Sequence, residues 1–354
     1  MAIVSTLGKR MTDDMKTQKT HDVYIIAEIG GNHEGDFGLA KELLNQAVDS
    51  GVNAVKFQAY TGEGIANKVV DPSRVKHFNK FTLSLENHIE LAEMCINSKV
   101  DYLASVWNKD MLQGLIPYMK HVKVGSGDLT NYRFFELISA YKKPLIISTG
   151  LSSEQEVIDA VKAIDRYYRD CEMGEQKHAL LQCTSMYPIE YSDANLNVMH
   201  RFKELFPNYQ IGYSDHTIGT TAIQVAISMG AKVIEAHFTD KKIKSDFRDH
   251  KVSKTIDEFK EIIKFSKQVK QLQGSNKKSL LEIEKAHGHE VSFRRSLYLN
   301  KKLPAGAVIG EQDVIALRPA AGIPASEFYS LLGKKLVRTK EALEIIEWHD
   351  FEGS

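Results

Sequence analysis

The chain has no excess of charge of either sign. Its 354 residues include 46 Lys and Arg against 46 Asp and Glu, so the formal net charge at pH 7 is zero. Proteins that hold nucleic acid or an anionic membrane over a broad surface usually carry a basic excess. The balance therefore argues against both kinds of partner, although it still allows a local basic pocket.

Cysteines and long apolar runs are also scarce. The three cysteines, Cys95, Cys171 and Cys183, form no CxxC pair, which argues against a disulfide framework and a cysteine-rich zinc site. No run of about 18 uncharged apolar residues occurs, so no transmembrane helix is expected. Residues 1–20 lack the apolar core of a signal peptide, and we interpret them as a flexible tail on a cytoplasmic protein.

Two nucleotide-binding signatures are missing as well. No GxGxxG follows the first apolar run, and no P-loop sequence is present. The first absence weakens the hypothesis of a dinucleotide-binding domain. The hydrophobic share is 43%, which is close to the average of folded globular proteins.

The main pattern is an alternation of short apolar runs with longer stretches of helical periodicity. The runs are rich in Val and Ile and nearly continuous in apolar character, as is typical of parallel strands buried on both faces. Eight runs are predicted as strands: residues 23–30, 54–60, 102–107, 121–127, 144–150, 178–185, 210–217 and 232–238. The alternation predicts an α/β fold, a (β/α)8 TIM barrel over residues 21–274, with a doubly wound open sheet as the alternative.

After Gly274 the pattern changes. Residues 275–292 are polar and are predicted to form a linker, whereas residues 293–354 contain short apolar runs separated by Pro and Gly turns. A small β-rich domain of about 60 residues is at the lower edge of independent stability. We therefore expect it to dock against the barrel or against a second chain.

Polar side chains fall at or near the C-terminal end of every predicted strand. They include Glu28, Lys56, Gln58, Ser105, Lys123, Ser126, Asp128, Ser148, Ser214, His216, Glu235 and His237. In a barrel these ends meet at one mouth, where active sites form. A purely structural protein would gain nothing from burying so many polar groups.

The two lysines inside apolar strands indicate an anion site. Lys56 alone could equally be a salt-bridged or snorkelling lysine, but Lys123 repeats the feature two strands later. Lysines together with serine hydroxyls form a plausible site for phosphate or carboxylate.

The two histidines His216 and His237 end adjacent predicted strands. With Glu28 and Glu235 nearby, a divalent metal site and a site without metal are about equally favoured. Mixed N and O ligands with open positions would suit Mn²⁺, Fe²⁺ or Zn²⁺ acting as a Lewis acid. The charged run 241–251 is predicted to be a solvated loop.

Taken together, these short motifs resemble the sialic acid synthase family. The resemblance is carried by Ala27-Glu28-Ile29-Gly30 with Asn32-His33-Glu34-Gly35, by Lys56-Phe57-Gln58, by Lys123 to Asp128, by Ser148-Thr149-Gly150, by Ser214-Asp215-His216-Thr217 and by Glu235-Ala236-His237-Phe238. The stretch 293–352, with Arg318-Pro319 and Leu332-Gly333-Lys334, resembles the antifreeze-like (SAF) domain of that family.

The resemblance implies an enzyme that condenses phosphoenolpyruvate (PEP) with the open-chain aldehyde of an N-acylated mannosamine-type sugar. It implies a divalent metal, usually Mn²⁺, bound by His216 and His237, and a homodimer in which the SAF domain of one chain caps the barrel of the other. The residues implied to hold PEP are Lys56, Ser105, Lys123, Ser126, Ser148 and Ser214. Those implied to face the sugar are Gln58, Asp128, Tyr187, Glu235, Asp249 and, from the partner chain, Arg318. Glu28 is implied to lie beside the reacting centre.

The sequence departs from the family pattern mainly on the sugar side. Phe247-Arg248-Asp249-His250 replaces the usual Gly-Pro-Asp run, Ser185 replaces an Asn, and Asp128 stands where Glu is common. Ala104-Ser105-Val106-Trp107 replaces a Ser/Thr-Thr-Pro-Phe type run. These departures predict a non-standard acceptor, such as a legionaminic- or pseudaminic-type precursor or another aldose.

Two other classes of protein are alternatives. One is another PEP-dependent 3-deoxy-ulosonate synthase that takes a phosphorylated or shorter aldose, which the appended SAF-like domain argues against. The other is a non-catalytic sugar- or metal-binding barrel. A binder of that kind need not keep both the lysines and the two histidines, so the enzyme is the favoured interpretation.

Overall fold

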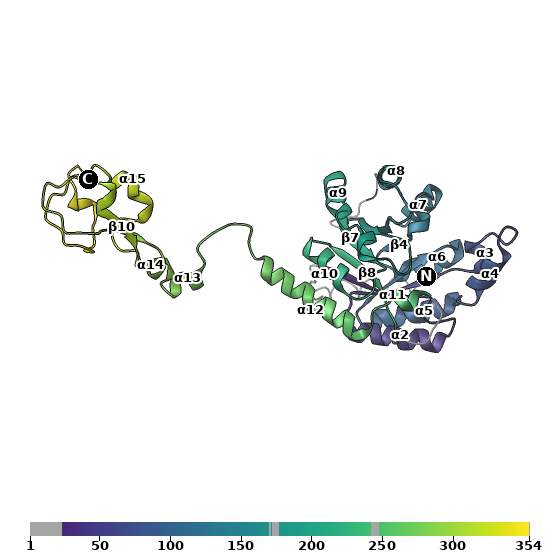
Figure 1. Ribbon diagram of the computed structural model, residues 1–354. Helices are drawn as coiled ribbons and strands as arrows, with labels where there is room; N and C mark the ends of the chain where they lie inside the picture. Colours follow the sequence, from purple (N-terminus) through teal and green to yellow (C-terminus); the bar gives the residue numbers. More distant parts are fainter. Residues whose placement is uncertain (1–22, 170, 172–176, 242–247, 354) are drawn as a thin grey trace, which may run out of the picture. The chain divides into compact units, whose positions relative to one another are not determined.

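The protein is described here by a computed structural model that covers residues 23–169, 171, 177–241 and 248–353 (Figure 1). The predicted tail, residues 1–20, lies outside the described residues. The chain divides into two compact units, Met1–Gly274 and Ser275–Ser354, and each is considered by itself.

The first unit is a closed barrel of eight parallel strands that pair in chain order, with β1 next to β8. The strands are β1 (Tyr24–Gly30), β2 (Ala54–Ala59), β3 (Asp101–Val106), β4 (Val122–Val124), β5 (Leu145–Ser148), β6 (Ala179–Cys183), β7 (Gln210–Asp215) and β8 (Val233–His237). The predicted TIM barrel is thus confirmed, and the open doubly wound sheet is excluded.

Helices follow the strands and surround the barrel (Figure 1). They are α2 (Phe37–Ser50), α3 (Gly62–Ile65), α4 (Pro72–Asn79), α5 (Leu85–Asn97), α6 (Lys109–Leu115), α7 (Tyr132–Ser139), α8 (Glu154–Tyr168), α9 (Val198–Leu205), α10 (Thr221–Ser228), α11 (Arg248–Val252) and α12 (Ile256–Gln273). Ser84, Ser153 and Thr255 begin α5, α8 and α12 with reciprocal capping boxes, which satisfy the free amides of a first helical turn. Within the described ranges, no helix is both long and apolar enough to cross a membrane.

Two layers of side chains fill the barrel. The lower layer is apolar: Ile26, Ala54, Leu103, Ile146, Ala179, Leu181 and Val233 form one buried cluster. Residues two apart on a strand point to the same face. Glu28, Lys56, Ser105, Ser148 and Glu235 each lie two positions beyond a member of this cluster, so they form a polar layer directly above it.

Seven of the eight strands are shorter than the sequence predicted, and β4 shows why. Strand β4 ends at Val124, because the residues after Gly125 turn into a 3₁₀ helix, Ser126–Asp128.

The second unit is a small domain with its own apolar core. Strands β9 (Ser296–Leu299) and β10 (Val314–Leu317) pair antiparallel, and Leu297, Leu299, Ile323, Leu331 and Ile346 belong to a separate buried cluster. The unit also contains α15 (Phe328–Leu331). Two short helices, α13 (Glu282–Ala286) and α14 (His289–Ser292), lie within the stretch predicted as a linker.

Candidate active site

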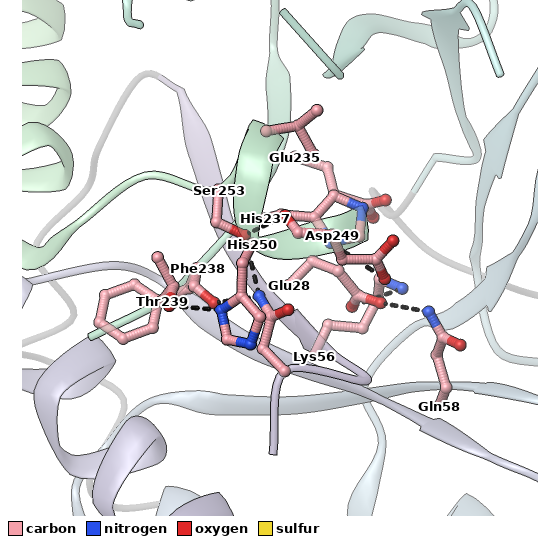
Figure 2. Close-up of polar contacts among 12 residues, drawn as sticks. Glu28, Lys56, Gln58, Glu235, His237, Phe238, Thr239, Asp249, His250 and Ser253 are labelled. Carbon is pink, nitrogen blue, oxygen red and sulfur yellow. Dashed lines mark hydrogen bonds and ion pairs between the residues drawn. The ribbon is translucent and has the colours of Figure 1, made fainter. Parts of the chain in front are cut away.

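A buried ion pair joins the first two strands at the mouth of the barrel. Lys56 Nζ lies 2.6 Å from Glu28 Oε2, and these residues are direct partners in the register of β1 and β2. Gln58 Nε2 donates a hydrogen bond of 2.9 Å to Glu28 Oε1 (Figure 2). Both carboxylate oxygens of Glu28 are therefore held in place, although the side chain is almost completely buried.

A second lysine and carboxylate lie across the barrel, but their contact is longer. Lys123 Nζ donates to Ser148 Oγ at 2.8 Å and to Val124 O at 3.0 Å. It lies 3.7 Å from Glu235 Oε2, which is beyond a hydrogen bond. Among the described residues, Glu235 Oε2 has no hydrogen-bond partner. The third hydrogen of Lys123 Nζ and the oxygen Glu235 Oε2 can therefore bind a ligand.

The four charges shift one another's pKa values. Burial raises the pKa of Glu28 above its ordinary value, and the charge of Lys56 offsets only part of the rise. Burial alone would lower the pKa of Lys56, but the charges of Glu235 and Glu28 hold it above its usual value. Burial lowers the pKa of Lys123 despite Glu235. Glu235 is buried too, yet Lys123 and Lys56 hold its pKa below the usual range.

The predicted serines lie around these lysines, with different partners. Ser105 Oγ is 3.5 Å from Lys56 Nζ, and Ser214 Oγ donates to Glu235 Oε1 at 3.3 Å. Ser126 is only half-buried, and its hydroxyl accepts from Gly150 N at 3.1 Å. The hydroxyls therefore belong to the same polar layer, with Ser126 at its edge.

The two predicted metal-ligating histidines lie next to each other. The ring centroids of His216 and His237 are 5.4 Å apart, and both residues are buried. His216 Nδ1 donates to Thr184 O at 2.7 Å, so in the neutral ring Nε2 has a free lone pair. The Tyr187 ring packs against both histidines, with its centroid 4.0 Å from that of His216 and 5.7 Å from that of His237.

Asp249 lies at the mouth beside these groups (Figure 2). Its Oδ2 is 3.9 Å from His237 Nδ1, and a Cβ added to Gly30 would come within 3.6 Å of the same oxygen and 3.1 Å of Glu28 Oε1. Gly30 also has φ +56°, so only glycine fits there without strain. Residues 242–247 of the run predicted as a solvated loop lie outside the described residues, whereas Asp249 and His250 at its end belong to α11 and are buried. The side chain of Arg248 lies outside the described part of the chain.

His216 and His237 bring two imidazoles together, and imidazole is a common ligand of divalent metals. Among the described residues, no group of three or more His, Cys, Asp or Glu side chains is arranged to hold a metal ion. A metal at these two rings would take its other ligands from substrate and water. The predicted metal role of the pair stays a prediction.

Two of the departures from the family pattern contact each other. Trp107 Nε1 donates to Asp128 Oδ2 at 2.7 Å, and the Trp107 ring packs edge-on against Tyr60. The pKa of Asp128 lies above its ordinary value, because burial raises it more than Trp107 and Lys123 lower it. The shorter acid and the larger aromatic side chain thus form one unit at the edge of the mouth.

Arg318 belongs to the second unit. It follows β10, is exposed, and its guanidinium lies 5.0 Å from the ring centroid of Phe293. Its predicted role toward the barrel of a partner chain stays a prediction.

Sequence reasoning missed two residues that hold the mouth together. Asn32 Nδ2 donates to Phe238 O and to Ser253 Oγ, each at 2.8 Å. Lys254 is completely buried and paired with Asp215 at 2.8 Å. The Gly-Gly-Asn sequence at the end of β1 is a signal for the first, whereas nothing in the local sequence marks Lys254.

A closed eight-stranded barrel with paired lysines and carboxylates at its C-terminal mouth is the architecture of a barrel enzyme. The chain belongs to the NeuB family, whose model matches residues 43–278, and residues 294–352 match the SAF domain. The predicted resemblance to sialic acid synthases and the prediction of an enzyme are thereby confirmed.

Two similar proteins match nearly the full chain, and a solved structure matches three quarters of it. The chain is 34% identical over 343 residues to N,N'-diacetyllegionaminic acid synthase of Legionella pneumophila, covering 93% of this chain and 94% of that protein. It is 32% identical over 351 residues to pseudaminic acid synthase of Campylobacter jejuni, with 93% and 96% covered. The crystal structure of N-acetylneuraminic acid (sialic acid) synthetase from Leptospira borgpetersenii in complex with citrate matches with a TM-score of 0.68 at 26% identity, covering 75% of this chain and 90% of that one.

Proposed function

We propose that this chain condenses PEP with the open-chain aldehyde of an N-acylated mannosamine-type sugar to give a sialic-acid-like nonulosonic acid and phosphate. The observation that carries the proposal is the buried layer of two lysines and two carboxylates above the apolar floor of the barrel. Membership of the NeuB family and the names of the relatives support it.

The lysines are suited to PEP, which carries about three negative charges that cationic and hydroxyl donors stabilise. Lys123 already donates two hydrogen bonds, and its third hydrogen is left for a ligand because Glu235 lies 3.7 Å away. Lys56 and the hydroxyls of Ser105, Ser126, Ser148 and Ser214 would supply the other donors. An anion between the lysines would favour the charged form of Lys123 and so oppose the lowering of its pKa by burial.

The reaction follows from the polarity of the two substrates. The C2=C3 π electrons of PEP attack the aldehyde carbon, so a C–C bond forms, the C=O π bond breaks, and the aldehyde oxygen takes a proton from solvent to become a hydroxyl. Water adds to the cationic C2 and loses one proton, and the C2–O bond to phosphate then breaks as the new C2 hydroxyl loses its proton to the leaving phosphate and becomes a ketone. Glu28 would accept the proton of that water, because its raised pKa makes the carboxylate a stronger base than an ordinary one.

His216 and His237 would hold the divalent metal, and Mn²⁺ is the ion that the family resemblance implies. Bound there, the metal would polarise the aldehyde of the acceptor. The hydrogen bond from His216 Nδ1 to Thr184 O orients the ring for that purpose.

The acceptor would be non-standard: a legionaminic- or pseudaminic-type precursor, or another aldose. The names of the two similar synthases support this choice, as does the contact between Trp107 and Asp128, two residues that depart from the family pattern. Gln58, Tyr187, Glu235 and Asp249 would also face the sugar. Arg318 would reach it from the SAF domain of a partner chain in a domain-swapped homodimer.

A panel of acceptors tests the proposal directly. The full chain is incubated with PEP and Mn²⁺ and with N-acetylmannosamine, diacetylated amino sugars of the legionaminic and pseudaminic series, and a phosphorylated aldose; phosphate release and product mass are measured. We expect phosphate release with a diacetylated sugar and a product heavier than the acceptor by one pyruvate unit. By far the best turnover with N-acetylmannosamine would reject the non-standard acceptor, and preference for the phosphorylated aldose would favour the other synthase class. No release with any acceptor would reject the function.

A further inference from the structure

Lys254 is a completely buried lysine between α11 and α12. Its Nζ lies 2.8 Å from Asp215 Oδ2, and it donates to Thr217 O at 2.7 Å and to Val252 O at 2.8 Å. Lys254 thus combines two hydrogen bonds with a close ion pair. The carboxylate that faces Lys123 is farther away, at 3.7 Å.

Asp215 is equally buried. Its Oδ1 accepts from Tyr213 Oη at 2.9 Å, from Thr217 N at 3.1 Å and from Thr217 Oγ1 at 2.9 Å. Burial and the charge of Asp215 raise the pKa of Tyr213, which keeps its hydroxyl a donor. These hydrogen bonds and the ion pair of Oδ2 with Lys254 hold the carboxylate in one orientation.

The position of the pair explains its use. Asp215 and Thr217 are the neighbours of His216 on either side, so the Lys254 side chain binds the chain both before and after that histidine. The Lys254 backbone binds the other histidine strand: its N–H donates to His237 O at 2.7 Å, and its carbonyl accepts from Thr239 N at 3.0 Å. One residue therefore connects the two segments that carry the paired imidazoles.

Stability alone does not require a charged pair here. Replacing a buried ion pair with apolar groups of similar size is often neutral or stabilising, because burial costs both ions their hydration. What the contacts provide is direction: Lys254 forms an ion pair with Asp215 at the end of β7 and donates hydrogen bonds to the carbonyls of Thr217 and of Val252 in α11. Metal ligands need to be held within about 0.5 Å of their productive positions.

We propose that Lys254, together with Asp215, is a positioning residue that sets the spacing of His216 and His237 and thereby the affinity of the barrel for a divalent metal. The proposal rests on the metal role in the proposed function. Residues behind metal ligands typically change metal affinity by about 10- to 100-fold when they are mutated.

The test measures binding of Mn²⁺ alone to the full chain by titration calorimetry, without substrates or turnover. The variants are Lys254→Met, the double variant Lys254→Met/Asp215→Asn, which leaves no buried charge unpaired, and His216→Ala. The matched control is Lys340→Met/Asp350→Asn, which changes a buried Lys–Asp pair in the second unit. Binding of PEP alone is measured on the same proteins, because a general distortion of the barrel would weaken both ligands.

We expect the Lys254→Met/Asp215→Asn variant to bind Mn²⁺ about 10- to 100-fold more weakly and PEP within about twofold of wild type, while the second-unit control binds both unchanged. Wild-type affinity for Mn²⁺ in the folded double variant would overturn this inference alone. Equal weakening of Mn²⁺ and PEP, or failure of the double variant to fold, would assign the pair to the general fold and overturn it as well. If the wild-type chain binds no Mn²⁺, the metal role in the proposed function fails and this inference with it.

Discussion

Lys123 in the barrel mouth and Lys340 in the second unit are both nearly fully buried lysines that face a carboxylate. Lys340 Nζ has acceptors in Asp350 at 2.9 Å, Ile345 O at 2.8 Å and Glu344 at 3.3 Å. Asp350 also accepts from Arg338 at 2.7 Å. Lys123 has two such acceptors and a carboxylate at 3.7 Å.

The difference separates a structural pair from a site. A buried charge that is fully hydrogen-bonded stabilises its own surroundings, whereas one with unused capacity gains most from a ligand. Lys254 resembles Lys340 in the closeness of its carboxylate partner, since Asp215 Oδ2 lies 2.8 Å away, although this pair lies directly behind the histidines.

The largest effects are expected when Lys123 and Lys340 are replaced in turn, because the first should change activity and the second stability. In Lys123→Met we expect kcat/KM for PEP to fall about 1,000-fold, since truncating one partner of a buried charged contact costs about 4 kcal/mol. Steady-state phosphate release measures it, and circular dichroism checks the fold. A fall of less than tenfold would mean that Lys123 does not contact PEP.

The Lys340→Met variant should instead lose stability. We expect the free energy of unfolding of the second unit to fall by about 2 kcal/mol, which is below the usual cost of about 3–5 kcal/mol for a broken buried pair because Arg338 still faces Asp350. Trp107 and Trp348 are the two tryptophans, so Trp348 fluorescence in a Trp107→Phe background reports on the second unit during urea unfolding. An unchanged midpoint of urea unfolding would show that the ion pair between Lys340 and Asp350 does not stabilise this unit.

A smaller effect is expected where Trp107 meets Asp128. Trp107→Phe keeps an aromatic ring but removes the N–H that holds the carboxylate, and hydrogen bonds to charged groups contribute about 1.5–3 kcal/mol. We expect KM for the preferred acceptor to rise about tenfold while KM for PEP stays within twofold. Asp128→Asn, which keeps an acceptor oxygen for Trp107, separates the loss of charge from the loss of position. An acceptor KM that stays unchanged in Trp107→Phe would remove the indole from acceptor selection.

The smallest effect concerns pH. Because Glu28 is proposed to act as a base and its pKa is raised, kcat should fall as pH decreases through a value above the ordinary carboxyl range. The hydrogen bond from Gln58 lowers the pKa of Glu28. Gln58→Met should therefore move the acid limb of the kcat profile upward by about 0.5 pH unit. A downward shift, or none, would assign the acid limb to another group.

Much of the fold and part of the site could be predicted from the sequence, for a physical reason. Strand parity and position alone put Glu28, Lys56 and Lys123 on the inner face near the C-terminal ends. The ends of the strands were overestimated because Gly125 and Gly150 continue the apolar runs in sequence although the chain has already left the sheet.

Contacts between distant loops could not be predicted. Lys254 stands just before the capping box that begins α12, where a lysine is ordinarily solvated, and its partner Asp215 is 39 residues earlier in the chain. The hydrogen bond between Trp107 and Asp128 is equally invisible, because it depends on how two βα loops turn toward each other.

The pairing of the first strand with the last has a consequence for synthesis of the protein. Glu28 is the register partner of His237, and these residues are separated by 209 positions. At about 5–20 residues per second, a ribosome needs about 10–40 s to make that stretch. During this interval Glu28 can pair with Lys56 from the neighbouring strand, but Lys123 has no Glu235 to face until β8 has been made. The nascent chain thus acquires its complete charged layer only when β8 docks and closes the barrel.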